Sequence, residues 1–258
     1  MLLSRLRLVT FDITGTLLKF KLTPGQQYGE ISALYGINCD GNELSKHFKE
    51  HWHRMSLVHP NFGRDTGLGW EEWWRTLVKK TFKDTRANVD EKKLDEVAFH
   101  LIELYKVSTC WQLCDGVSGL LSYIRSKNIP MGVISNFDPR LHVTLTNIKL
   151  RHFFHFILTS YEAGFEKPDP KIFQEAMARS KLEGLKPEEC LHIGDQVCYD
   201  YIGAKNSGWQ AVIISDTEIS SLKKNNPEIE PSHVFDSLFG LHKHFIQTSK
   251  EDIFSQKL

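Results

Sequence analysis

The sequence predicts an α/β protein whose doubly wound parallel sheet carries an inserted all-helical segment. Five short apolar runs lack the strict alternation of a strand with one wet face, which is typical of parallel strands covered on both faces. Helical patterns separate the last four runs, as expected when a crossover helix follows each strand. Residues 20–112 differ from the rest, because they contain helical patterns and no convincing strand.

The expected elements follow from these patterns in chain order. The apolar runs predict strands at residues 6–11, 129–135, 156–160, 190–193 and 210–214. Between them, helices are expected in GVSGLLSYIRSKN, DPRLHVTLTNIKL, DPKIFQEAMARSKL and YDYIGAKNSG. The inserted segment is expected to form helices at about 25–36, 41–56, 70–83 and 91–107, divided by the turn-rich stretch VHPNFGRDTGLG. We therefore assign residues 1–19 and 113–258 to a core domain and residues 20–112 to a helical domain.

The composition excludes several classes of protein. The 258 residues contain 32 Lys and Arg and 32 Asp and Glu, so the balance of charge gives no basis for binding nucleic acid or an anionic membrane. No apolar run reaches the roughly 18 residues that a membrane-spanning helix needs. The start, MLLSRLRLVTF, is interrupted by two arginines and is expected to be a first strand, not a signal peptide. The five cysteines are odd in number and fit no zinc-binding spacing, which favours reduced thiols in the cytoplasm.

Polar side chains follow the expected strands at the points where they end. Asp12 ends the first strand, Ser135 and Asn136 end the second, and Asp195 follows the fourth. Lys167 comes shortly after the third strand, in GFEKPDP. Each residue alone has a structural explanation, such as a helix cap for an Asp. Because the carboxyl ends of parallel strands meet at one edge of a sheet, their order nevertheless predicts a ligand site there.

In this order the residues resemble the four motifs of the haloacid dehalogenase superfamily. The first motif is similar to DITGT, the second to VISN, the third to KPDP and the fourth to GDQVCYD. The resemblance covers essentially the whole chain and implies a Rossmann-like core with an inserted helical cap of the C1 type. Within the superfamily the sequence is similar to the group named haloacid dehalogenase-like hydrolase domain-containing protein 3. Its insect members are indicated by PGQQYGEI, PNFGRDT, NFDPRL and KPEECLHIGD.

The resemblance implies catalytic and phosphate-binding roles for five residues. Asp12 is expected to attack phosphorus and form an aspartyl-phosphate, and Lys167 is expected to pair with Asp12 and with the phosphate. Ser135 and Asn136, with nearby backbone N–H groups, are expected to bind the phosphoryl oxygens. Thr16 is expected to order the first loop at this phosphate site. General chemistry agrees, because an ionised carboxylate is a competent nucleophile and a lysine offsets the charge of the phosphoryl group.

The resemblance also implies a Mg²⁺ site at the same edge of the sheet. Asp12, Asp195 and the backbone carbonyl of Thr14 are expected to ligate the ion, and Asp200 is expected to support it directly or through water. Mg²⁺ prefers oxygen ligands in an octahedron and keeps several waters, which this set of groups allows. A divalent ion would offset the repulsion between the carboxylates and a phosphate dianion.

Thr14 departs from the pattern of the superfamily's phosphatases, in which an Asp two residues after the nucleophile transfers protons. A threonine hydroxyl is a poor acid and a poor base, and such proton transfer contributes about 10²–10⁴-fold in rate. The sequence therefore predicts a slow Mg²⁺-dependent phosphatase, a monomer that acts on a small phosphorylated substrate. One alternative is a protein that binds a phosphorylated ligand or partner without catalysis. A 2-haloacid dehalogenase is the less favoured alternative, because dehalogenases of the superfamily lack the motif that Gly194 and Asp195 provide.

Three other features are assigned structural roles. Trp70, Trp73 and Trp74 recur at helical spacing and are expected to pack in the core of the helical domain rather than to form a substrate cage. The two histidines of HWH, together with His59, have no Cys or carboxylate at metal-ligand spacing and are expected on the surface. Cys198, inside the fourth motif, is expected to be a packed or inert thiol.

Overall fold

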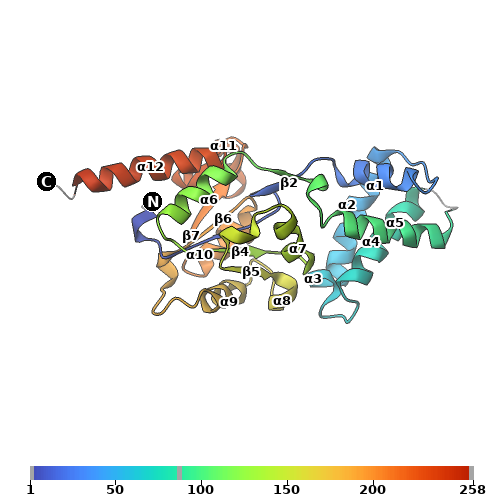
Figure 1. Cartoon of the computed structure of the whole chain (residues 1–258), viewed down its shortest axis with the longest axis horizontal. Coiled ribbons are helices and arrows are strands. Elements are labelled where there is room, and N and C mark those ends of the chain that lie inside the picture. The colour runs from blue at the N-terminus through green and yellow to red at the C-terminus, as the bar shows by residue number, and fades with distance from the viewer. Residues whose placement is uncertain (1–2, 86–88, 256–258) are drawn as a thin grey trace. The chain divides into compact units, whose positions relative to one another are not determined.

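A computed structural model of the chain describes residues 3–85 and 89–255 (Figure 1). The chain divides into two compact units. The first unit consists of Met1–Lys19, Leu113–Asn136 and Leu150–Leu258. The second unit consists of Phe20–Gln112 and Phe137–Lys149.

The first unit contains a six-stranded sheet in the order β5-β4-β1-β6-β7-β8, with every neighbouring pair parallel. The strands are β1 (Leu8–Phe11), β4 (Met131–Ser135), β5 (Phe156–Thr159), β6 (Cys190–Gly194), β7 (Gln210–Ile214) and β8 (Val234–Phe235). The predicted parallel α/β fold is confirmed, and the five expected strands all occur. The sixth strand, β8, was not predicted, because two residues are too few to give a periodic signal.

Helices cover both faces of this sheet, which explains why the strands are apolar without alternation. Figure 1 shows α6 (Val117–Ser126) and α12 (Leu238–Ser255) side by side on one face, and α8 (Ser160–Ala163) and α9 (Pro170–Ser180) on the other. The apolar cluster around α9 joins Ile172 and Phe173 of that helix to side chains from five strands, among them Leu8, Ile134, Leu158, Cys190 and Ile213. The shorter helices of this unit are α10 (Gly203–Asn206) and α11 (Ile219–Asn225). Short 3-10 turns lie at Leu3–Arg5, Arg151–Phe153, Pro187–Glu189 and Pro231–His233.

The second unit is built from helices, as predicted. Its helices are α1 (Pro24–Ala33), α2 (Gly41–Val58), α3 (Pro60–Gly63), α4 (Trp70–Thr85), α5 (Glu91–Leu104) and α7 (Arg140–Asn147), with a 3-10 turn at Ser108–Cys110. Polar caps fix where they begin: Thr23 forms a capping box with Gln26 at α1, and the Asp40 carboxylate accepts two backbone N–H bonds at α2. Their apolar faces form one core, which includes Tyr28, Leu44, Val78, Phe82, Leu94 and Leu101.

The second unit also takes in Phe137–Lys149, a segment that the sequence analysis assigned to the core domain. Two contacts explain its membership. The guanidinium of Arg140, which is almost fully buried, lies 4.7 Å from the ring centre of Trp74. The indole N–H of Trp74 donates to Oδ2 of Asp138 at 2.8 Å. These bonds join segments that are 64 residues apart, a proximity that helical periodicity does not reveal.

A small two-stranded sheet lies where the two units meet along the chain. It pairs β2 (Leu18–Phe20) with β3 (Trp111–Leu113). These two strands are not predicted from the sequence, because each has only three residues and their pairing is long-range. The finding adds to the predicted helical segment without changing its class.

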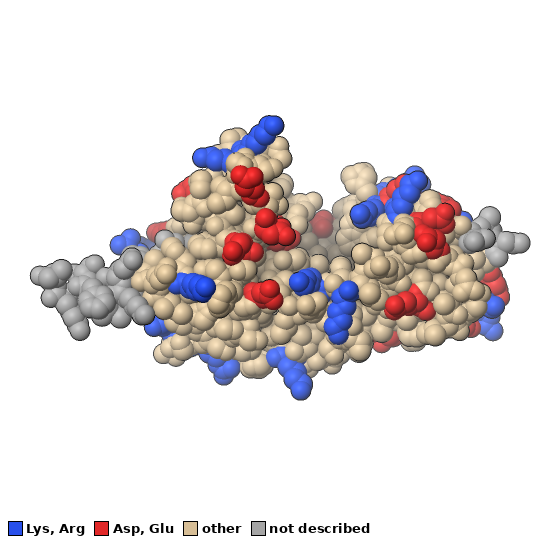
Figure 2. Space-filling model, turned by 90° about the horizontal axis from the view of Figure 1, so that it is seen from above, with Lys and Arg blue, Asp and Glu red and all other residues tan. Residues whose placement is uncertain are grey.

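Charged side chains of both signs share the surface. On the face shown in Figure 2, Lys and Arg side chains and Asp and Glu side chains are both spread over the surface. This distribution agrees with the formal net charge of zero. Within residues 3–85 and 89–255, we find no helix that is both long enough and apolar enough to cross a membrane.

Candidate active site

Asp12 lies at the carboxyl end of β1, in the middle of the sheet. Its backbone N–H donates to the carbonyl of Ile193 at 2.9 Å, which continues the pairing of β1 with β6. Directly afterwards the chain turns: the carbonyl of Ile13 accepts the N–H of Leu17 at 2.9 Å, and Gly15 adopts a φ of 92°, which favours glycine. The strand and the turn therefore hold the Asp12 carboxylate at the sheet edge with 7% of the residue exposed.

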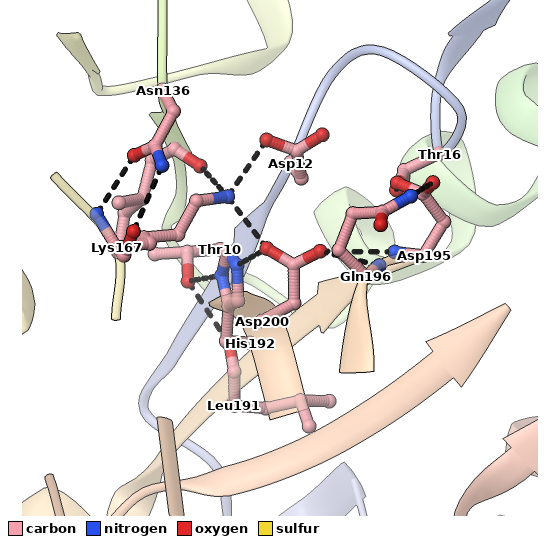
Figure 3. A network of polar contacts seen from close by, with 11 residues as sticks. Thr10, Asp12, Thr16, Asn136, Lys167, Leu191, His192, Asp195, Gln196 and Asp200 are labelled. Atoms are coloured by element: carbon pink, nitrogen blue, oxygen red, sulfur yellow. Dashed lines mark hydrogen bonds and ion pairs between the residues drawn. The ribbon is translucent and has the colours of Figure 1, made fainter. Parts of the chain in front are cut away.

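The ammonium of Lys167 is the cation of this site (Figure 3). Its Nζ donates to Oδ1 of Asp12 at 2.7 Å, to Oδ1 of Asp200 at 2.6 Å and to the carbonyl of Ile134 at 2.8 Å. An ammonium has three donors, so all three are used. Lys167 is 3% exposed, and the two carboxylates keep its pKa above the usual value although burial alone would lower it.

Asn136 fixes the backbone of the loop that carries Lys167. Its Oδ1 accepts the backbone N–H of Lys167 at 2.7 Å, and its Nδ2 donates to the carbonyl of the same residue at 2.9 Å. The amide of Asn136 is therefore engaged in positioning Lys167. Ser135, the last residue of β4, is 2% exposed beside it. The expected binding of phosphoryl oxygens by Ser135 and Asn136 stays a prediction.

Asp200 is held from four directions. It lies in the π-helical segment η5 (Val197–Ile202), a geometry that is frequent at functional sites. Oδ2 accepts the backbone N–H groups of Asp195 at 3.1 Å and Gln196 at 2.9 Å. Oδ1 accepts bonds from Lys167 at 2.6 Å and from His192 at 3.1 Å. Although burial alone would raise it, the pKa of Asp200 is kept well below its usual range by Lys167 and His192.

Asp195 is the third carboxylate, and it faces the turn after β1. Oδ1 accepts the hydroxyl of Thr16 at 3.1 Å, and Oδ2 accepts the side-chain amide of Gln196 at 2.6 Å. Burial raises the pKa of Asp195, and these two hydrogen bonds oppose that shift. A Cβ atom on Gly15 would collide with this carboxylate, so the turn requires glycine for space as well as for φ. Thr16 was expected to order the phosphate loop, and its hydroxyl donates to Asp195 in this turn.

The charges of the site do not balance. Three carboxylates surround one ammonium, and the neighbouring His192 has a pKa lowered by burial. Burial also raises the pKa of Asp12 to about 6, against the attraction of Lys167, and the charges of Asp200 and Asp195 add to the increase. The protein thus holds more negative charge at this edge than its own cation neutralises.

This excess of negative charge fits a divalent cation. Asp12, Asp195 and Asp200 each offer an oxygen, and these oxygens lie within 4.8 Å of one another. Oxygen ligands of this kind suit Mg²⁺. Both oxygens of Asp200 already accept two bonds each, so support through water fits Asp200 better than direct ligation. Thr14, whose carbonyl is the other expected ligand, is half-buried in the adjoining turn.

Two residues of the site were not predicted. His192 in β6 and Thr10 in β1 are both 0% exposed and lie opposite each other in the sheet. Thr10 Oγ1 lies 2.8 Å from Nδ1 of His192, whose Nε2 bonds Asp200. The available signal was a polar residue inside each of two apolar runs, but the sequence does not reveal that these two residues are paired.

The structure also bears on the tryptophans, histidines and Cys198, which were assigned structural roles. Trp73 is 1% exposed in the second unit, as expected, whereas Trp70 and Trp74 are only half-buried. The expectation of surface histidines is wrong for His51, which is buried and lies 2.8 Å from Asp84. Among the described residues, only the three carboxylates above form a group suited to hold a metal ion. Cys198 was expected to be a packed or inert thiol; it is exposed, so it is not packed, and whether it is inert stays a prediction. None of the five cysteines forms a disulfide.

Comparison with known proteins identifies relatives of this chain. Residues 6–208 match the sequence model of the haloacid dehalogenase-like hydrolase family. The chain is 50% identical over 248 residues to the Rhythmically expressed gene 2 protein of Drosophila melanogaster, covering 93% of this chain and 95% of that protein. It is 33% identical over 214 residues to haloacid dehalogenase-like hydrolase domain-containing protein 3 of Bos taurus, covering 83% and 84%. The predicted resemblance to this group and to an insect member is confirmed.

A solved structure supports the fold. The magnesium-bound putative HAD-hydrolase YfnB of Bacillus subtilis is similar with a TM-score of 0.66, covering 93% of this chain and 99% of that chain. The two sequences are 18% identical, so the likeness concerns the fold alone.

Proposed function

Because this chain belongs to the haloacid dehalogenase-like hydrolase family, we propose that it is a Mg²⁺-dependent phosphatase acting through an aspartyl-phosphate at Asp12. The observation that carries this proposal is the buried ion pair between Asp12 and Lys167 inside a group of three carboxylates. A nucleophile, a cation and an excess of oxygen ligands at one sheet edge are the parts that phosphoryl transfer requires.

The first step is a substitution at phosphorus. A carboxylate oxygen of Asp12 forms the new P–O bond, and the P–O bond to the leaving group breaks with its electron pair on the leaving oxygen. Lys167 stabilises the negative charge of the transferring group from beside Asp12. In the second step a water oxygen forms a bond to the same phosphorus, and the P–O bond to Asp12 breaks with its electron pair on the carboxylate oxygen. The proton of the water leaves with the inorganic phosphate, and the carboxylate is regenerated.

Mg²⁺ is assigned to Asp12, Asp195 and the carbonyl of Thr14, with Asp200 in support. Bound there, the ion would supply positive charge to offset the three carboxylates and the phosphoryl oxygens. The contribution of the protein is to hold these carboxylates in place through Thr16, Gln196 and the backbone N–H groups that bind Asp200. Burial raises the pKa of Asp12, and a cation bound beside it would favour the ionised form that attacks phosphorus.

Thr14 makes the proposed enzyme slow on poor leaving groups. No carboxylate stands two residues after Asp12 in the chain, and a hydroxyl does not protonate a departing alkoxide near neutral pH. Acyl and aryl phosphates need no such acid, because their leaving groups are stable anions. The proposed substrates are therefore small phosphorylated molecules with good leaving groups.

Trapping the covalent intermediate tests the proposal. The protein is incubated with acetyl phosphate and Mg²⁺, quenched in acid and digested, and the peptide that contains Asp12 is examined by mass spectrometry. A phosphoryl adduct that decays slowly is expected for the wild type, and no adduct for Asp12→Asn. Equal labelling of the two proteins would exclude Asp12 as the nucleophile.

Thr14 also favours a second candidate function, in which the site binds a phosphorylated ligand or partner without hydrolysis. This candidate predicts Mg²⁺-dependent binding of acetyl phosphate by calorimetry with no adduct and no release of inorganic phosphate. The phosphatase proposal predicts the adduct instead, so one set of samples separates the two functions.

A further inference from the structure

A buried polar chain runs behind the candidate active site, on the side of Asp200 away from Asp12. Thr10 and His192 pair across β1 and β6 in the centre of the sheet, and both are 0% exposed. The ring of Phe173 meets the imidazole edge-on at 5.5 Å, so the surroundings are otherwise apolar. A buried polar group costs stability unless it is hydrogen-bonded, so two such residues opposite each other require an explanation.

The hydrogen bonds of His192 define which of its nitrogens carries the proton. Nε2 lies 3.1 Å from Oδ1 of Asp200, which as a carboxylate oxygen only accepts, so Nε2 carries the hydrogen. Nδ1 lies 2.8 Å from Oγ1 of Thr10. The Thr10 hydroxyl has two acceptors in reach, Nδ1 and the carbonyl of Leu191 at 3.3 Å, and Nδ1 is the nearer. Burial lowers the pKa of His192 and favours the neutral ring, so Nδ1 accepts from the Thr10 hydroxyl and the ring is the Nε2–H tautomer.

Asp200 and Lys167 connect the Thr10–His192 pair to Asp12. Oδ1 of Asp200 receives both the His192 bond and the Lys167 bond, and Lys167 Nζ continues to Oδ1 of Asp12 at 2.7 Å. Figure 3 shows these side chains in sequence from Thr10 to Asp12. The other oxygen of Asp200 is fixed by backbone N–H groups, so His192 is the side-chain donor besides Lys167 that sets the position of Oδ1.

We propose that His192, oriented by Thr10, is a positioning residue that aims the ammonium of Lys167 at Asp12 by fixing Asp200. The predicted effect on the rate of Asp12 phosphorylation rests on the proposed phosphatase function, whereas the hydrogen-bond geometry does not depend on it. Partners that orient a reacting group from behind are typically worth roughly 10–100-fold in activity. The step affected is the attack of Asp12 on phosphorus, in which Lys167 takes part.

Two amide substitutions separate positioning from packing. In His192→Gln the side-chain nitrogen falls near the place of Nε2 and can still donate to Asp200. In His192→Asn it falls near the place of Nδ1, and the donor to Asp200 is lost. We expect Asn to slow phosphorylation of Asp12 by acetyl phosphate and Mg²⁺ roughly 10–100-fold, and Gln to recover most of that loss. Rates within twofold of the wild type for Asn, or an equal loss in both variants, would overturn the proposal.

A second measurement does not depend on turnover. Nitrogen-15 NMR of the wild-type protein should show His192 with a protonated Nε2 and an unprotonated Nδ1. The amide signals of Asp195 and Gln196, which bond Asp200, should shift in His192→Asn and much less in His192→Gln. A protonated Nδ1, or amide signals of Asp195 and Gln196 that do not shift in either variant, would refute the positioning role. If the wild type forms no adduct while the NMR result holds, it is the phosphatase function that fails.

Thr10→Val provides a control at the far end of the chain. It removes the hydroxyl and keeps the shape of the side chain, whereas Thr10→Ser keeps the hydroxyl. We expect Val to broaden or shift the His192 nitrogen signals and to lower the phosphorylation rate in the same direction as His192→Asn. Identical behaviour of Val and Ser would exclude the hydroxyl as the group that orients the ring.

Discussion

Lys167 and Asp12, which are 155 residues apart in the chain, form a buried ion pair with 2.7 Å between Nζ and Oδ1. The same ammonium lies 2.6 Å from Oδ1 of Asp200. One cation therefore stands between two carboxylates that have little contact with water. The energetic consequences of this arrangement can be measured separately from catalysis.

Replacing Lys167 by Met should destabilise the protein strongly. The substitution keeps much of the apolar stem but leaves Asp12 and Asp200 buried without their cation, which costs about 3–5 kcal/mol in comparable buried pairs. Urea unfolding in the presence of EDTA measures the effect. Lys171→Met, at an exposed lysine of α9, is the matched control and should stay within about 0.5 kcal/mol of the wild type. A loss below about 1 kcal/mol for Lys167→Met would contradict a structural role for the pair.

Asp12→Asn should stabilise the metal-free protein by about 1–3 kcal/mol. The pKa of Asp12 is raised from 3.8 to about 6, so the folded protein prefers the neutral form that Asn imitates. Because the folded state binds the proton more tightly, stability falls as pH rises from about 4 to 6. The gain from Asn should therefore be absent below pH 4 and complete above pH 6. Thermal unfolding at several pH values in EDTA measures this.

Added Mg²⁺ should reduce the difference in unfolding free energy between Asp12→Asn and the wild type, because the ion stabilises the ionised carboxylate of the wild type. Asp115→Asn, at an exposed aspartate, should show neither effect. If Asp12→Asn is less stable than the wild type at pH 7 in EDTA, the charge of Asp12 stabilises the folded protein, which would contradict this prediction.

The proposed phosphatase should discriminate between substrates by their leaving group. Without an acid at residue 14, aryl phosphates should react about 10²-fold or more faster than alkyl phosphates of similar size. Steady-state kcat/KM values for phenyl phosphate and for a cyclohexyl or butyl phosphate supply the comparison. Equal values on both would mean that some other group protonates the leaving oxygen.

Thr14→Asp should raise turnover of alkyl phosphates by about one to several decades, within the range of acid–base catalysis. The gain should be small for aryl phosphates, which do not need the proton. Thr14→Asn carries a similar shape without an ionisable group and should give no gain. An increase with Asn as large as with Asp would assign the effect to packing of the turn rather than to proton transfer.

The cysteines should differ in reactivity toward iodoacetamide at pH 8. Burial raises the pKa of Cys110 and raises that of Cys190 to about 12, so neither supplies the thiolate that reacts. Cys198 is exposed and should be modified first. Peptide mass spectrometry over time gives the order, and Cys198→Ser should remove the fastest phase. Modification of Cys190 before Cys198 would contradict the burial of the sheet.

The sequence predicted the central sheet well, because parallel strands covered on both faces are apolar over their whole length. The strand β7 occurs at the predicted residues, Gln210–Ile214. The strands β2, β3 and β8 escaped prediction for the opposite reason. They have two or three residues each, and their existence depends on partners that lie elsewhere in the chain.

The residues at strand ends were also predictable. Asp12, Lys167 and Asp195 come together in the structure, since the topology of the sheet brings the ends of its strands to one edge. Asp200, which was expected from the family resemblance alone, joins them. The hydrogen bonds behind them were not predictable. That His192 lies opposite Thr10 depends on the register between β1 and β6, which a single sequence does not contain.

The helical unit is assembled from two separate stretches of chain, and this affects how it can be exchanged between proteins. Residues 20–112 carry most of its helices, but Asp138 and Arg140 bond its tryptophans from beyond Ser135 and Asn136. If residues 20–112 alone were moved into another protein, residues 137–149 would still come from the recipient. Trp74 would then lack its partner Asp138. Exchange of this unit therefore requires two segments to be replaced together, with four junctions, one of which adjoins Asn136.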